Sequence, residues 1–195
     1  MHTRLLAAVA AGVVSILGAA GCSTTATPGA TLSPSPTAAA SSRAPNPYGI
    51  GPIDPPAPGS PVLTVRGGSA PLALTLDKLN ALGNTTLTID EPFIKRRETY
   101  SGVPLGVVLG KAGIPETATI DTVGLDDYHY ISTAKPMIES RALIATDRGG
   151  APIPYDEGGP IRIVFPNGTP LSSVLDAWNW SLESITVKAS GEPGP

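Results

Sequence analysis

Residues 149–166 read Gly-Gly-Ala-Pro-Ile-Pro-Tyr-Asp-Glu-Gly-Gly-Pro-Ile-Arg-Ile-Val-Phe-Pro, and this run carries the clearest structural pattern in the chain. Two prolines restrict the backbone at its start, and the Asp-Glu-Gly-Gly that follows has the composition of a turn. Pro160 then opens a predicted strand in which alternate Ile, Ile and Phe side chains share one face. Arg162 lies on the other face, so we expect a cation opposite a buried apolar row.

The surrounding residues alternate between strand and helix patterns. Thr75 and Gly83 bracket one predicted short helix, and Pro104 and Gly113 bracket a second. A single helical turn or a plain turn is expected at residues 136–141. Alternating or β-branched residues predict strands at 62–66, 85–89, 119–125, 128–133, 142–146 and 184–188. This mixture indicates one α+β domain over residues 62–189.

Several of these strings, taken in order, resemble the sulfite-oxidase-like, molybdopterin-binding domain family. The run at 149–166 is similar to the family pattern G-x-P-L-P…G-G-P-x-R-x-x-x-P, and residues 100–114 are similar to W-x-G-V-P-L…L-L…A-G-V. The Asp-Tyr at 127–128 resembles a D-G-Y hairpin without its Gly, and Trp180 resembles the family's closing Trp. The resemblance spans about residues 75–188. It implies an α+β fold with a mixed β-sheet, a barrel-like core and short helices.

The resemblance also implies ligands that this chain lacks. Catalytic members hold molybdenum through a cysteine in the loop that corresponds to residues 90–99, and Cys22 is the only cysteine here. Asp90 or Glu91 would supply hard oxygen and make a different metal centre. The family also has a basic residue for the cofactor's phosphate just before the closing Trp, where this chain has Asn179. We therefore expect no bound cofactor, although the resemblance implies molybdopterin.

The former cofactor cleft is the candidate site for another ligand. The run Lys-Arg-Arg-Glu at 95–98 is the densest charge cluster; it is typical of a solvated loop or edge, and an anion site is the alternative. The candidate walls of the cleft are Lys95, Arg96, Arg97, Arg162 and Trp180.

No catalytic or metal-binding set is predicted elsewhere. His129 is interpreted as a strand histidine, because it has no cysteine or second histidine nearby to complete a metal site. Ser132 and Ser140 lack the Gly-x-Ser-x-Gly elbow of a serine hydrolase. The acids at 126–127 are typical hairpin turn formers, and a cation site with Glu139 is the alternative.

The N-terminus has the pattern of a secretion signal. A basic start is followed by an apolar run at 5–17, shorter than the ~20 residues of a transmembrane helix. Ala-Ala-Gly-Cys at 19–22 is similar to a bacterial lipoprotein signal, which predicts a signal peptide at 1–21 and an acylated, palmitate-bearing Cys22. An ordinary signal peptide with an incidental Cys22 is the alternative.

The segments that flank the domain are poor in large apolar residues. Residues 22–61 are mostly Ser, Thr, Ala, Pro and Gly, which predicts a disordered tether, and residues 190–195 predict a disordered tail. The wealth of Ala, Gly and Pro points to a GC-rich actinobacterium. Together these features predict an envelope protein on the extracytoplasmic face of the cell membrane.

Charge and composition restrict the function. The net charge of −3 gives no basic excess, so a nucleic-acid partner is not expected. We expect a non-catalytic, membrane-anchored lipoprotein that binds a small ligand or an envelope protein. The alternatives are a molybdopterin-dependent oxidoreductase with an atypical active site and a passive wall or spacer protein.

Overall fold

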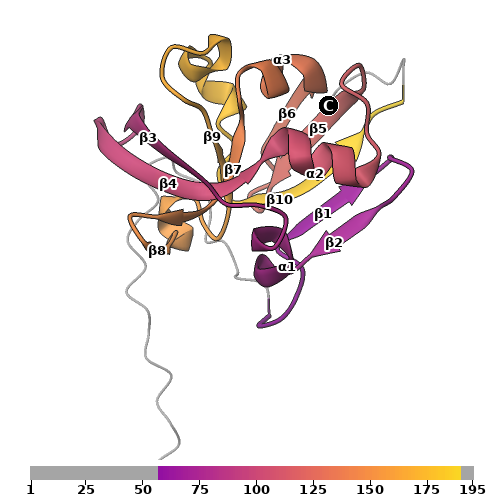
Figure 1. Cartoon of the computed structure of the whole chain (residues 1–195), viewed down its shortest axis with the longest axis horizontal. Helices are drawn as coiled ribbons and strands as arrows, with labels where there is room; N and C mark the ends of the chain where they lie inside the picture. The colour runs from indigo at the N-terminus through magenta and orange to yellow at the C-terminus, as the bar shows by residue number, and fades with distance from the viewer. Residues whose placement is uncertain (1–56, 190–195) are drawn as a thin grey trace, which may run out of the picture. The chain divides into compact units, whose positions relative to one another are not determined.

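The computed structural model describes residues 57–189, which fold into two β-sheets with short helices (Figure 1). The predicted signal peptide, Cys22, most of the predicted tether and the tail at 190–195 lie outside the described residues. Within the described range, no helix is long and apolar enough to cross a membrane. The elements are β1 (Leu63–Arg66), β2 (Leu72–Leu74), α1 (Leu76–Asn80), β3 (Thr85–Glu91), β4 (Arg96–Pro104), α2 (Leu105–Ala112), β5 (Thr119–Gly124), β6 (His129–Thr133), α3 (Ala134–Glu139), β7 (Leu143–Arg148), β8 (Ala151–Pro152), η1 (Tyr155–Glu157), β9 (Arg162–Val164), η2 (Pro170–Ser173), η3 (Leu175–Ala177) and β10 (Leu182–Val187).

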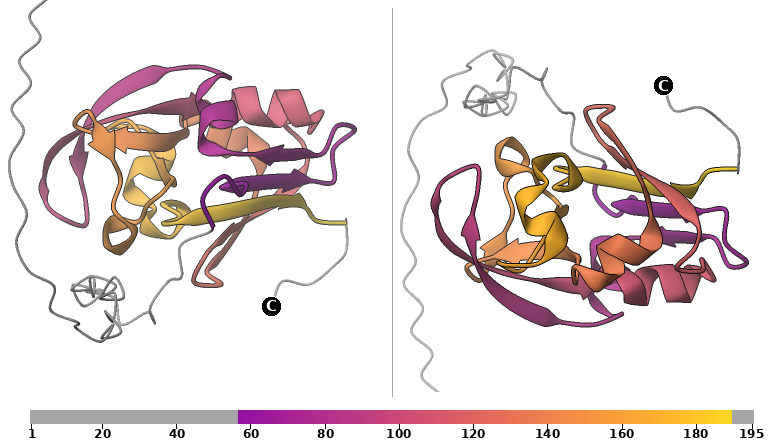
Figure 2. Two further views of the ribbon diagram at one scale, coloured as in Figure 1. Left: turned by 90° about the horizontal axis from the view of Figure 1, so that it is seen from below. Right: turned by 90° about the horizontal axis from the view of Figure 1, so that it is seen from above.

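The first sheet brings the two ends of the described chain together. Its strand order is β2-β1-β10-β5-β6. β1 and β10 are parallel neighbours, with Val65 opposite Ile185, and the other neighbours are antiparallel. Figure 2 shows β10 beside β1, with the β5–β6 hairpin at the far edge of the sheet.

The second sheet carries the residues of the candidate site. Its order is β3-β4-β7-β8, and β9 also pairs with β7. β3 and β4 form an antiparallel hairpin that is paired from Thr85 and Gly102 to Glu91 and Arg96. After a bulge next to Gly102, β4 continues along β7. The β3–β4 hairpin and β9 are therefore held on opposite sides of β7 in one sheet.

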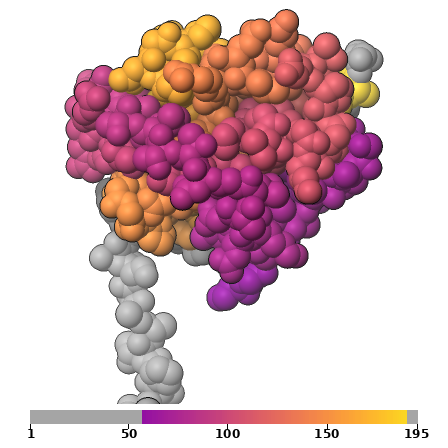
Figure 3. Space-filling model, viewed as in Figure 1, coloured from indigo at the N-terminus to yellow at the C-terminus, as the bar shows by residue number. Residues whose placement is uncertain are grey.

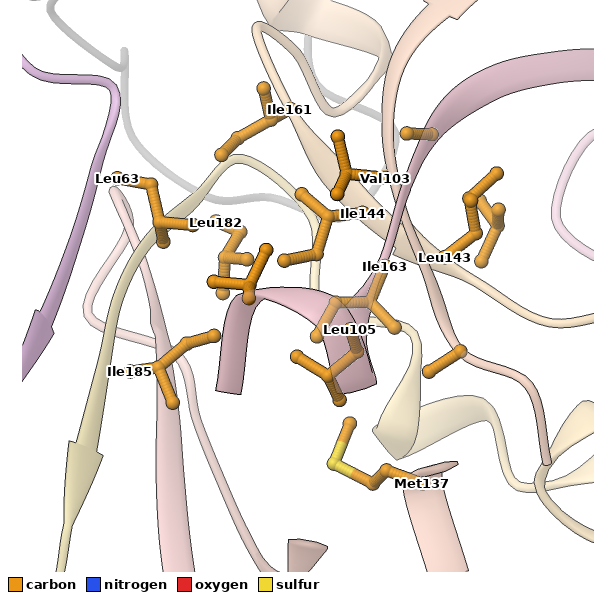
Figure 4. Close-up of a cluster of buried hydrophobic side chains, with 14 of the residues drawn as sticks. Leu63, Val103, Leu105, Met137, Leu143, Ile144, Ile161, Ile163, Leu182 and Ile185 are labelled. Atoms are coloured by element: carbon orange, nitrogen blue, oxygen red, sulfur yellow. The ribbon is translucent and has the colours of Figure 1, made fainter. Parts of the chain in front are cut away.

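Both sheets and the helices α1, α2 and α3 contribute to one hydrophobic core (Figure 4). α2 begins after Pro104 and ends at Gly113, which has φ +68° and needs no Cβ there. Its buried residues face the same core as the sheets. The labelled side chains in Figure 4, each at most 1% exposed, are Leu63, Val103, Leu105, Met137, Leu143, Ile144, Ile161, Ile163, Leu182 and Ile185.

Most predicted elements are confirmed, with shifted ends. Thr75 caps α1 by accepting a hydrogen bond from the Lys78 amide at 3.3 Å, but the helix ends at Asn80, before Gly83. The single turn expected at 136–141 is the helix α3, which begins two residues earlier. The predicted α+β fold class is confirmed by two sheets with short helices, while the short strands β2 and β8 were not expected.

Two expectations about the site need correction. Residues 90–99 are not a loop, because Asp90 and Glu91 end β3 and Arg96 to Thr99 begin β4. The face of β9 that carries Arg162 was expected to differ from the buried apolar row, yet all three residues of β9 are buried. A strand covered on both faces has no alternation of exposure, so the residue pattern of β9 does not show that the Arg162 face is also buried.

Candidate functional site

Arg162 is the largest fully buried side chain of the described residues, with 1% exposure. Its Nη2 lies 3.0 Å from Oε1 of Glu91, and its Nη1 donates to the carbonyl oxygen of Glu157 at 3.3 Å. Burial lowers the pKa of Arg162, and the neighbouring Tyr100 and Glu91 partly offset this. An arginine stays protonated in proteins, so the site contains a buried positive charge that must be paired.

Glu91 pairs that charge and also closes the hairpin turn. Its side chain is fully buried at the end of β3. Oε1 contacts Arg162, while Oε2 accepts hydrogen bonds from the amides of Phe93 at 2.8 Å and Ile94 at 2.7 Å. Both carboxylate oxygens are thus engaged. The hairpin tip and the buried arginine are one connected structure.

Aromatic rings enclose the guanidinium. The Cζ of Arg162 lies 4.3 Å from the ring centroid of Trp180, 5.8 Å from that of Tyr100 and 5.9 Å from that of Phe93. Phe93 and Trp180 also pack edge to face, with centroids 5.2 Å apart. Ring faces attract a cation and exclude water, so the arginine is surrounded by a carboxylate, a carbonyl and aromatic faces.

A second ion pair balances the charge of the region. Arg148, from the end of β7, pairs with Glu157 of η1, the residue whose carbonyl oxygen accepts from Arg162. The region then holds two arginines, Arg148 and Arg162, and two carboxylates, Glu91 and Glu157. It carries no excess of positive charge that would attract an anion.

The structure brings some of the predicted cleft residues together and separates others. Trp180 lies over Arg162 and is itself half-buried. Lys95, Arg96 and Arg97 are exposed at the hairpin tip, where Arg96 pairs with Glu98. Figure 3 shows the β3–β4 segment at the surface, beside the chain that follows β9. Ligand binding by these five residues stays a prediction.

Sequence reasoning missed the partner and the enclosure of Arg162. Glu91 was considered only as an oxygen ligand, and Phe93 and Tyr100 were not predicted to enclose Arg162. One signal was available, because period-two alternation places Glu91 on the same side of β3 as the buried Ile89. An acid on a buried face needs a cationic partner, and the Arg162 face of β9 supplied one.

The other candidates are structural. His129 lies on β6, and its Nδ1 is 2.9 Å from Oδ2 of the buried Asp121. Ser132 donates to the Thr133 carbonyl, and Ser140 accepts from the Leu171 amide. Across residues 57–189, no group of three His, Cys, Asp or Glu side chains is placed to hold a metal ion.

The comparisons with known proteins identify the fold family. Residues 93–191, just over half of the 195-residue chain, match the oxidoreductase molybdopterin binding domain. The chain belongs to this family. Among solved structures, the fold is similar to the sulfane dehydrogenase SoxCD from Paracoccus pantotrophus, with a TM-score of 0.52 and 20% identity. That match covers 67% of this chain and 39% of the SoxCD chain, and a search of curated proteins finds no match.

The residues of this molybdopterin-binding domain do not fit its cofactor. The described residues include no cysteine to ligate molybdenum. Asp90 and Glu91 cannot replace it together, because alternation directs them to opposite sides of β3 and Asp90 bonds Asn167 at the surface. Asn179, which stands where the family has a basic residue, is buried and donates to Thr122. Residues 57–189 thus lack both the cysteine and the basic residue that the family resemblance implies for the metal and the cofactor's phosphate.

Proposed function

We propose that this protein is a lipoprotein anchored through Cys22 to the extracytoplasmic face of the membrane. Its molybdopterin-binding domain is non-catalytic and binds a small ligand or an envelope protein. The observation that carries the proposal is the contact between Glu91 and Arg162. It neutralises, inside the protein, the arginine that belongs to the family pattern described above.

Cofactor binding would require an exchange of partners at Arg162. An anionic cofactor group would have to displace Glu91, and this would strand a carboxylate in a region where it is fully buried. Displacement would also free the amides of Phe93 and Ile94, which Glu91 satisfies. Both losses oppose cofactor binding, so the retained fold serves another purpose.

The exposed part of the site is the hairpin tip. Lys95 and Arg97 are exposed there, and Trp180, which covers Arg162, is half-buried. We propose that the ligand or partner contacts these three residues, with Arg96 at the rim and Arg162 as the buried support beneath them.

Elemental analysis of protein produced in a host that makes molybdopterin tests the non-catalytic assignment. The expected result is no stoichiometric molybdenum. One molybdenum atom per chain would establish the alternative, a molybdopterin-dependent oxidoreductase with an atypical active site. Family membership favours that alternative, in which Asp90 or Glu91 is the candidate oxygen ligand of the metal.

Native mass spectrometry of protein released from envelopes tests the binding role. A co-purifying molecule or partner is expected with the wild type and lost in the Lys95→Ala/Arg97→Ala variant. The control is Lys78→Ala/Lys111→Ala, which removes the same charge from exposed positions on α1 and α2. Retention of the bound species after the hairpin substitutions would remove the hairpin tip from the site.

A further inference from the structure

The Glu91 carboxylate occupies the guanidinium of Arg162, and the inference drawn from this contact rests on the proposed absence of the cofactor. We infer that the Glu91 carboxylate is an internal substitute for an anionic ligand. Glu91 is then the residue that keeps other anions away from the guanidinium of Arg162. The position would accept a small carboxylate once the Glu91 side chain is shortened.

The geometry of Glu91 supports its role as an occupant. Both oxygens of its side chain are engaged at the site itself, one by Arg162 and one by the turn amides. A bound carboxylate ligand is held in the same manner, by a guanidinium on one oxygen and backbone amides on the other. Glu91 is thus bonded as a ligand would be, but it is covalently attached.

The remaining polar capacity of Arg162 points to the same conclusion. Its Nε is buried and has no hydrogen-bond partner among residues 57–189, although guanidinium groups commonly bind carboxylates through two nitrogens. Glu91 reaches only Nη2, because its backbone is fixed in the paired end of β3. A free carboxylate has no such constraint and can approach both nitrogens.

Charge explains why the wild type excludes other anions. Arg148 and Arg162 face Glu91 and Glu157, so the pairing is complete. A further anion would bring an unmatched negative charge into a site walled by Phe93 and Trp180. Removing Glu91 reverses this balance and leaves one cation without a partner.

Chemical rescue with acetate tests the inference. Glu91→Ala deletes the γ-carbon and the carboxylate, and acetate has the same heavy atoms as the deleted group. The variant should lose on the order of 10 °C or more in Tm, because Arg162 is left as an uncompensated buried charge. Acetate at roughly 0.1 M should restore several degrees relative to chloride at equal ionic strength.

Two controls make the rescue specific. The Glu91→Ala/Arg162→Met variant has no buried cation, so its Tm should be the same in acetate and in chloride. Glu98→Ala removes a carboxylate that pairs with an exposed arginine of the same hairpin, and it should not respond to acetate either. Wild-type Tm should also be equal in the two salts.

The outcomes separate this inference from the proposed function. If Glu91→Ala is unfolded in chloride, acetate-dependent recovery of its circular dichroism is the supporting result. A Glu91→Ala protein that is equally unstable in both salts overturns the inference. Acetate rescue together with stoichiometric molybdenum in the wild type would overturn the proposed function and leave the anion site standing.

Discussion

At the scale of single residues, the buried charge of Arg162 dominates the energetics of the site. Removing one partner of a buried ion pair costs about 3–5 kcal/mol, because the other charge stays uncompensated. Glu91 would keep its two turn amides if Arg162 were replaced, but its Oε1 would lose the guanidinium that pairs it. Arg162 is therefore a determinant of the stability of the domain, whatever the domain binds.

Arg162→Met should lower the free energy of unfolding by about 3–5 kcal/mol, and urea denaturation measures this loss. Arg97→Ala is the matched control, since Arg97 is exposed on the same sheet. Its effect should stay within about 0.5 kcal/mol. Equal effects of the two substitutions would contradict the buried-pair description.

Tyr100 gives the site a dependence on alkaline pH. Burial raises the pKa of Tyr100 above its ordinary value of 10.0, and the nearby Arg162 and Arg148 charges offset part of this shift. The folded protein thus holds the phenolic proton more tightly than the unfolded chain. The stability that this adds is complete below pH 10 and is lost as the pH rises toward the folded-state pKa.

Between about pH 9 and 11, the range around the ordinary tyrosine pKa, thermal melts should therefore show a steeper loss of stability for the wild type than for Tyr100→Phe. The reason is that phenylalanine cannot ionise. The two proteins should have parallel profiles at neutral pH. Parallel profiles across the alkaline range as well would mean that Tyr100 ionises without cost in the folded state.

At the scale of secondary structure, the antiparallel pairing of β4 with β7 positions the hairpin. The bulge at Gly102 brings the two backbones so close that a Cβ there would collide with the carbonyl oxygen of Ile144. The same hairpin carries Glu91 at its other end. A shift of β4 against β7 would therefore move the ion pair as well as the core.

Gly102→Ala should destabilise the domain by about 1–3 kcal/mol, because neither backbone can yield without breaking the ladder. Gly110→Ala is the contrasting control: it lies within α2, where a Cβ meets nothing within 4 Å. Alanine there should stabilise by about 0.5–1 kcal/mol through helix propensity. Urea unfolding of both variants checks the signs, and a neutral Gly102→Ala would show that the strands can separate locally.

At the scale of the whole molecule, the domain is expected to work at a membrane although no described helix could span one. The proposed attachment is an acyl group on Cys22, the only cysteine of the chain. Two or more acyl chains hold a protein stably on a bilayer, whereas an unmodified polar tether has nothing to insert.

Cys22→Ala should consequently move the protein from the membrane pellet to the soluble fraction. Fractionation and immunoblotting of cells that express either form provide the measurement, with Ser23→Ala as the control that leaves the cysteine intact. A Cys22→Ala protein that still sediments with membranes would refute the lipid anchor.

Local chemistry explains how far the sequence could be interpreted by itself. The caps at Thr75 and Gly113, the alternating strands and the turn before β9 depend on neighbouring residues, so their patterns were visible in the chain. The lack of a second cysteine is likewise a property of composition. These features determined the α+β class and the family resemblance, and they led to the expectation that the cofactor is not bound.

Only the tertiary structure decided the state of Arg162. Its partner Glu91 is 71 positions away in the chain, and the two meet because β7 pairs with both β4 and β9. The sequence showed a cation opposite an apolar row, but not that Phe93, Tyr100 and Trp180 cover that second face. Burial depends on which elements pack against a strand, and the local pattern of residues does not show which elements these are. For this reason Arg162, which was expected to contact a ligand, forms an internal ion pair that only the tertiary packing shows.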